Sequence, residues 1–98
     1  MSRKVIFHRL VRPEISEVKR YYERQRKGLG NDFVAAIRAQ LGKIEEHPEI
    51  YGVIEADIRV AILPRFPYAV YFRLAERRIQ IIAVIHTSRD SSIWRTRS

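Results

Sequence analysis

The spacing of apolar residues changes from helix-like to strand-like near the middle of the chain. An alternating segment at residues 4–11 is typical of a strand. Apolar residues then recur every three or four positions, which predicts one helix that opens at Pro13 and stops at Gly28. A second helix is expected from the cap residue Asn31 to His47. The connection between the two is so short that they should form an antiparallel hairpin.

Alternation with a period of two follows Gly52 and predicts three strands, at residues 58–63, 68–74 and 78–86. The last strand is apolar on both faces and is therefore expected at the centre of the sheet. The order β-α-α-β-β-β predicts a single α+β domain over residues 1–98. In it, a helical hairpin packs on one face of a mostly antiparallel four-stranded sheet, and the other face is partly open to a partner.

The charge of the chain is strongly unbalanced. Its 98 residues carry 19 Lys and Arg against 11 Asp and Glu, a formal net charge of +8. Residues 59–98 hold 8 of the basic side chains and 2 of the acidic ones, and each of those 8 is an arginine. Arginine binds phosphate and carboxylate groups in a bidentate manner. We therefore expect an anionic partner, nucleic acid or an acidic protein segment; the alternative is a solvated basic face.

Several function classes are excluded or disfavoured by composition. The absence of cysteine excludes a disulfide scaffold, a thiolate zinc site and a cysteine nucleophile. The three histidines are widely spaced, so neither a metal nor a cofactor is expected. The sequence holds no phosphate-binding loop, dinucleotide fingerprint or Ser-His-Asp arrangement. The longest apolar run, residues 81–85, is too short to span a membrane, and we expect a cytoplasmic protein.

The candidate catalytic and binding residues lie in the second half of the chain. His86 closes the last predicted strand, where it is either an acid–base group acting on a phosphodiester or a cap on the sheet edge. Trp94, beside Arg95, either forms a binding hot spot or folds back with Ile93 to seal the core. The whole candidate surface comprises Arg59, Arg65, Tyr68, Arg73, His86, Arg89, Trp94, Arg95 and Arg97.

Two arginines and two tyrosines interrupt the apolar pattern of the strands. Arg59 and Arg73 either clamp a phosphate or carboxylate group, or lie on the solvent face with their stems packed flat. Tyr68 and Tyr71 are three apart and therefore point to opposite faces of the sheet. One of the two rings is expected to be buried against the helices, and the other to be open.

The chain resembles the RelE/ParE toxin superfamily over nearly its whole length. Residues 58–73 look like the sheet of these toxins, and residues 81–86, with Arg89 and Trp94 beyond them, look like their C-terminal signature. The helical hairpin that ends before Pro48 fits as well. The resemblance implies a toxin of a type II toxin–antitoxin system, which forms a hetero-oligomer with a cognate antitoxin, often through an acidic segment.

The two branches of this superfamily act on different targets, and the resemblance implies one or the other. Nuclease members tend to carry a basic residue near the position of Tyr68 and an acid–base group or tyrosine close to the C-terminus. Here Tyr68 holds the first position, and residues 87–90 contain no tyrosine. A ParE-like inhibitor of DNA gyrase is therefore expected, with a working surface formed by Arg59, Arg65, His86, Arg89, Trp94 and Arg95. The alternative is a RelE-like ribosome-dependent mRNA endoribonuclease, with His86 as acid or base and Arg59 and Arg89 as phosphate clamps. A third possibility is a member that has lost toxicity and only binds its antitoxin or operator.

Overall fold

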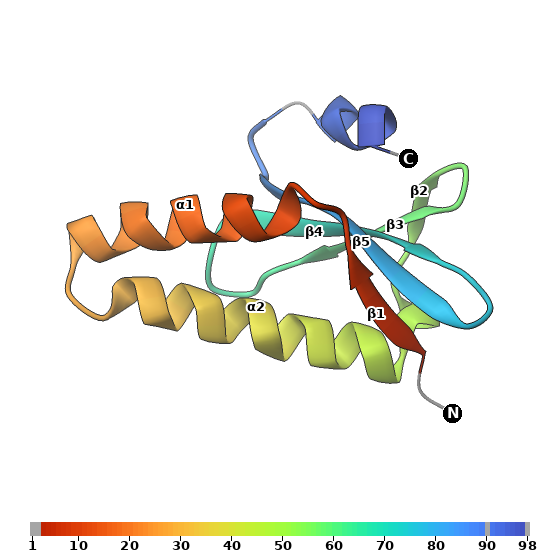
Figure 1. Ribbon diagram of the computed structural model, residues 1–98, viewed down its shortest axis with the longest axis horizontal. Helices are drawn as coiled ribbons and strands as arrows, with labels where there is room; N and C mark the ends of the chain where they lie inside the picture. Colours follow the sequence, from red (N-terminus) through yellow and green to blue (C-terminus); the bar gives the residue numbers. More distant parts are fainter. Residues whose placement is uncertain (1–2, 90, 98) are drawn as a thin grey trace.

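The computed structural model of the chain describes residues 3–89 and 91–97. A short strand precedes two long helices, and further strands and short 3-10 helices follow them (Figure 1). In chain order the elements are β1 (Lys4–Phe7), α1 (Val11–Gln25), α2 (Leu29–Glu46), the 3-10 helix η1 (Pro48–Ile50), β2 (Val53–Glu55), β3 (Ile58–Ile62), β4 (Tyr68–Leu74), β5 (Arg78–His86) and the 3-10 helix η2 (Ser91–Arg97).

The strands form one mixed sheet in the order β1-β5-β4-β3-β2. Strand β1 is parallel to β5, and the other neighbouring strands are antiparallel. The expected α+β class, the mostly antiparallel sheet and the central place of β5 are confirmed. The expected number of four strands is wrong, because β2 completes a fifth. This strand is three residues long and exposed throughout, so it has no alternation of buried and exposed positions that a sequence pattern could reveal.

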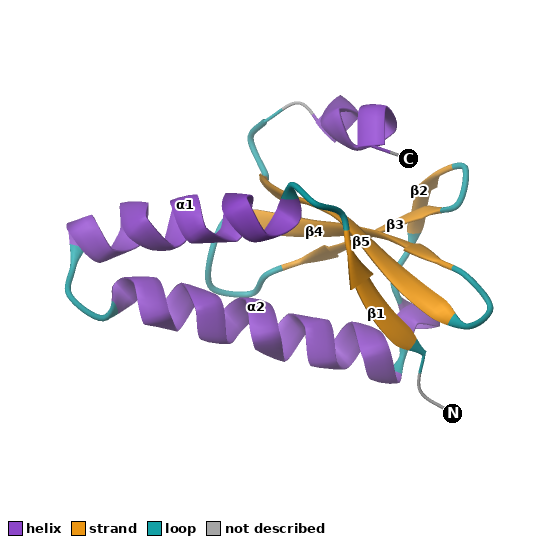
Figure 2. Ribbon diagram, in the orientation of Figure 1, coloured by secondary structure: helices purple, strands orange, loops and turns teal. Residues whose placement is uncertain are grey.

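The two helices lie together on one face of the sheet (Figure 2). Their buried side chains meet those of the strands in one apolar cluster, and the helix-like spacing of apolar residues is thereby confirmed. Burial of this kind is the main favourable term in folding. The most buried members of this cluster are Val11, Phe33, Ile44, Val70, Phe72, Ile79 and Ile81, each with at most 1% of its surface exposed.

Part of the opposite face of the sheet is covered by η2, a helix that the sequence pattern did not predict, and the end of β3 at Ile62 is 63% exposed there. Trp94 of η2 is 4% exposed and packs in a second apolar cluster with Tyr71 and Ile82. The expectation that one of the two tyrosines is open is therefore wrong, since Tyr71 is 9% exposed beneath η2. Tyr68 is half-buried on the helical face, where its ring lies 5.3 Å from that of Phe33.

A bulge in β5 adapts this strand to both clusters. Tyr71 is opposite Ala83 and Phe72 is opposite Ile81, so Ile82 is the extra residue. Before the bulge Ile81 faces the helices, and after it Val84 does. Both Ile82 and Ala83 therefore belong to the cluster beneath η2. The bulge explains why β5 reads as apolar without alternation.

The ends of the helical hairpin differ from the sequence prediction. Helix α1 begins at Val11, so Pro13 lies inside the first turn, where a proline costs no hydrogen bond. Gly28, with φ of 88°, leads into α2 two residues before the predicted cap Asn31. Glu23 of α1 takes over the capping role, because its carboxylate accepts the N–H groups of Gly28 at 2.9 Å and Gly30 at 3.0 Å.

Candidate functional site

Two predicted site arginines of strands β3 and β4 hold the fold together. Arg59 donates to the carbonyl oxygens of Tyr51, at 2.7 Å, and of Glu49, at 3.3 Å, and so ties η1 to β3. Arg73 donates from Nε to both carboxylate oxygens of Asp57, at 3.0 and 2.9 Å. These contacts give each guanidinium a protein partner, as a partly buried charge requires. For Arg73, the expectation of a solvent-face arginine applies better than that of a phosphate clamp.

The η2 residues of the predicted surface also have structural contacts. Arg95 binds both carboxylate oxygens of Glu55, at 2.9 and 2.5 Å, and its guanidinium lies 5.2 Å from the centre of the Trp94 ring. This contact lowers the pKa of the Glu55 carboxyl, chiefly through the hydrogen bond from Arg95. Arg97 is bound by Glu14 of α1. Trp94 therefore seals the core, the second of the two roles considered for it.

His86, Tyr68 and Arg89 are brought together at the end of β5. Tyr68 and His86 are paired across the sheet, with ring centres 5.1 Å apart and nearly perpendicular planes. The N–H of Ser88 donates to Nδ1 of His86 at 3.0 Å, so the neutral ring carries its proton on Nε2. The N–H of Arg89 donates to the His86 carbonyl oxygen at 3.0 Å. His86 is therefore half-buried and oriented by its own following turn.

Helix α1 supplies a wall that the sequence analysis missed. A cleft of about 460 Å³ is lined by Glu17, Tyr21, Tyr22, Arg24, Pro67, Tyr68 and His86. It continues into a hollow of about 100 Å³ that shares Glu17, Tyr68 and His86 and reaches Arg89. We call these two together the α1–β5 cleft. A signal existed in the sequence, because residues 14, 17, 21 and 24 recur at three and four and share one helix face.

Tyr22 and Tyr68 of the α1–β5 cleft have raised pKa values, so both hydroxyls are protonated at neutral pH. Burial is the main cause that raises the pKa of Tyr68, and the Arg89 guanidinium acts against it. Burial likewise raises the pKa of Tyr22, and Tyr68 adds to this effect. Arg89 and Tyr68 line the same part of the cleft. Within the described residues, Arg89 forms no salt bridge with a carboxylate.

Arg59 lies away from this cleft. It is opposite Phe72 on β4, whereas His86 is opposite Tyr68, four residues along the same strand. Four residues of strand span about 13 Å. The structure therefore unites two members of the predicted nuclease set, His86 and Arg89, and separates the third. Arg65 is exposed in the β3–β4 loop, with its guanidinium 5.7 Å from the centre of the Phe66 ring.

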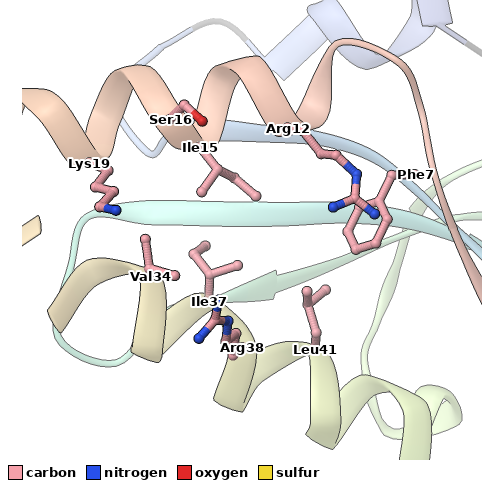
Figure 3. Close-up of a pocket in the computed structure, with 9 residues that line it drawn as sticks. All are labelled: Phe7, Arg12, Ile15, Ser16, Lys19, Val34, Ile37, Arg38 and Leu41. Atoms are coloured by element: carbon pink, nitrogen blue, oxygen red, sulfur yellow. The ribbon is translucent and has the colours of Figure 1, made fainter. Parts of the chain in front are cut away.

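A second hollow lies between the two helices. This hairpin groove has a volume of about 400 Å³ and a mostly apolar floor, in which Ile15 of α1 points toward Val34 and Ile37 of α2 (Figure 3). Three cations surround the floor, and no salt bridge binds any of them within the described part of the chain. They are Arg12, Lys19 and Arg38.

Metal-binding groups and membrane-spanning helices are absent from residues 3–89 and 91–97. No group of three His, Cys, Asp or Glu side chains that might hold a metal ion occurs among them. No helix in the same ranges is long and apolar enough to cross a membrane.

Comparison with known proteins identifies one family and one similar fold. The family described as "ParE toxin of type II toxin-antitoxin system, parDE" matches residues 5–91. Among solved structures, the fold is similar to one titled "Chromosomal ParDE TA system from P. aeruginosa", with a TM-score of 0.66 and 13% sequence identity. That alignment covers 88% of this chain and 97% of the other. No curated protein is significantly similar in sequence.

Proposed function

We propose that this chain, which belongs to the ParE toxin family of type II toxin–antitoxin systems, inhibits DNA gyrase in the cytoplasm and is neutralised by a cognate antitoxin. The family match over residues 5–91 carries the proposal. The use of Arg59 inside the molecule supports an inhibitor over an enzyme. Its Nη1 atom donates to two carbonyl oxygens near η1, and its position on the sheet is about 13 Å from that of His86, away from the cleft in which a phosphate would react.

The α1–β5 cleft is the target-contact surface in this proposal. Of the residues predicted to contact the target, Trp94 is buried and Arg59 and Arg95 have partners within the fold. Arg65, His86 and Arg89 remain. His86 and Arg89 lie on the cleft, whereas Arg65 is exposed in the β3–β4 loop. An exposed arginine beside aromatic rings is typical of a binding hot spot.

A supercoiling assay tests this proposal. Purified antitoxin-free protein is added to gyrase and relaxed plasmid, and supercoiled and linear products are both measured. We expect loss of supercoiling with accumulation of linear plasmid. Arg89→Ala should raise the half-inhibitory concentration about tenfold. Arg77→Ala removes the same charge from the β4–β5 turn and should have little effect. Normal supercoiling at protein concentrations that arrest growth would exclude gyrase as the target.

The antitoxin is expected to bind in the hairpin groove. An amphipathic helix can place apolar side chains on the floor formed by Ile15, Val34 and Ile37. Acidic side chains on the same helix can pair with Arg12, Lys19 and Arg38, none of which forms a salt bridge within the described residues. An acidic partner also associates quickly with a chain of net charge +8.

Charge reversal tests the groove. The double variant Arg12→Glu/Arg38→Glu should lose rescue of growth by the co-expressed antitoxin while remaining toxic, because its α1–β5 cleft is intact. The matched variant Arg77→Glu/Arg78→Glu changes the same charge away from the groove and should still be rescued. Equal rescue of both double variants would show that the antitoxin binds elsewhere.

Cleavage of mRNA is the second candidate function, and the position of His86 favours it. Its Nδ1 accepts a backbone hydrogen bond, which leaves Nε2 as the ring atom for proton transfer in the cleft. A general acid–base group contributes about 10²- to 10⁴-fold to a rate. Under this alternative, the parent chain cleaves mRNA on ribosomes, and His86→Ala abolishes both this cleavage and toxicity. If the chain inhibits gyrase instead, the parent chain and His86→Ala both leave mRNA intact.

A further inference from the structure

The walls of the α1–β5 cleft are unusually aromatic for a surface hollow. The ring centres of Tyr22 and Tyr68 are 6.3 Å apart, and those of Tyr68 and His86 are 5.1 Å apart. Tyr21 lies 5.3 Å from Tyr22 and is itself 49% exposed. An aromatic side chain this exposed has an open face, and a planar ring is the group that gains most from stacking on it.

Two arginines also line the cleft that contains these rings. Arg24 lines the cleft from α1, and Arg89 lines it from the segment after β5. Both side chains are exposed, and neither forms a salt bridge within the residues that the structure describes. Two arginines flanking a set of rings match a ligand that has a planar group between two anionic groups.

Glu17 is the acidic residue that lines both parts of the cleft. A carboxylate repels a phosphate but accepts hydrogen bonds from the N–H groups on the edge of a nucleobase. The interior of the cleft therefore suits a base, and its two ends suit the phosphates.

We propose that the α1–β5 cleft binds one unpaired nucleotide of a single-stranded nucleic acid. The base stacks on Tyr21 and Tyr68, and the flanking phosphates pair with Arg24 and Arg89. A base within a duplex is stacked on its neighbours and cannot enter such a cleft without unpairing. The inference rests on the proposed function, since it names the ligand class of the same target-contact surface.

Fluorescence anisotropy with labelled oligonucleotides tests the proposal without gyrase. The probes are an oligothymidylate of about eight nucleotides, the size that small single-strand binding sites cover, and a duplex of equal charge. Loss of stacking on one base costs about 5- to 140-fold in affinity, so Tyr21→Ala should weaken binding within this range. Tyr21→Phe keeps the ring and should bind like the parent chain. The duplex should bind more weakly than the single strand.

Salt dependence separates a specific phosphate contact from general attraction. Removing one contact to single-stranded nucleic acid lowers the slope of log affinity against log salt by about 0.7. Arg89→Ala should show this change, whereas Arg77→Ala should keep the parent slope. Equal slopes in the two variants, equal affinities of Tyr21→Ala and Tyr21→Phe, or tighter duplex binding would each overturn the proposal.

The outcome also separates this inference from the proposed function. Normal oligonucleotide binding with no inhibition of gyrase would overturn the gyrase proposal and support the nucleotide site. Inhibition of gyrase without single-strand binding would do the reverse.

Discussion

The carboxylate of Glu14 accepts hydrogen bonds from both terminal nitrogens of Arg97, at 2.9 and 2.5 Å, across 83 residues of sequence. Glu14 also accepts the N–H of Val84 at 3.3 Å, and Arg97 also donates to the carbonyl oxygen of Ile82 at 3.2 Å. One ion pair therefore joins α1, the bulged part of β5 and η2. Its side chains are 25% and 11% exposed, so water screens the pair only in part.

Breaking this pair should destabilise the fold. Glu14→Gln and Arg97→Ala should each lower the free energy of unfolding by about 1–3 kcal/mol, because each leaves a partly buried charge without its partner. The double variant should lose less than the sum, as measured by urea denaturation. Arg95→Ala, which breaks the exposed pair with Glu55, serves as the control and should have a much smaller effect. Additive losses would show that the two side chains are not coupled.

Two glycines of α2 should respond oppositely to alanine. A Cβ at Gly30 would lie 2.6 Å from the Lys19 carbonyl oxygen of α1, so Gly30→Ala should force the helices apart and cost about 1–3 kcal/mol. A Cβ at Gly42 meets no atom within 4 Å, and Gly42→Ala should stabilise the helix by about 0.5–1 kcal/mol. Thermal unfolding measures both, and a loss of stability in Gly42→Ala would contradict the expected open space.

The Glu23 cap should make stability depend on acid pH. Hydrogen bonds from the N–H of Gly28 and then of Gly30 lower the pKa of the Glu23 carboxyl, and Lys19 assists. A lowered folded-state pKa gives stability that is present above the unfolded-state pKa and is lost as pH falls through the folded-state value. The difference in melting temperature between the parent chain and Glu23→Gln, measured from about pH 3 to pH 7, should shrink toward acid pH. If the difference in melting temperature does not change with pH, the ionised Glu23 carboxylate is not the source of the added stability.

Trp94 should matter more for its bulk than for its indole nitrogen. Its Nε1 is buried and has no hydrogen-bond partner among the described residues. Trp94→Phe loses contact area but also removes this unsatisfied donor, and should cost about 1 kcal/mol. Trp94→Ala should cost about 3–5 kcal/mol and detach η2. Denaturant unfolding compares the two, and equal stability of all three chains would show that η2 does not seal the sheet.

Local patterns in the sequence were sufficient to predict most of the elements. An element that is buried on one face needs apolar residues at regular spacing. This requirement produces the helical spacing of Ile15, Val18 and Tyr22 and the period of two in the strands. The hairpin and the α+β class followed from these patterns, and the family resemblance followed from the residues at 58–73 and 81–86 with Arg89 and Trp94. Element ends were less accurate: the Glu23 cap of α2 comes from another helix, and no local rule contains it.

The tertiary structure alone decided which arginines are available to a partner. Arg59 and Arg89 look equivalent in sequence, yet one bonds two carbonyl oxygens and the other lies beside Tyr68 with no carboxylate within salt-bridge distance in the described residues. The difference depends on contacts between segments far apart in the chain. The bulge at Ile82, the cover of η2 and the Tyr21 wall of the cleft have the same origin. Sequence periodicity indicates on which face of its helix or strand a side chain lies. The residues that this side chain contacts are determined only when the sheet and helices pack together.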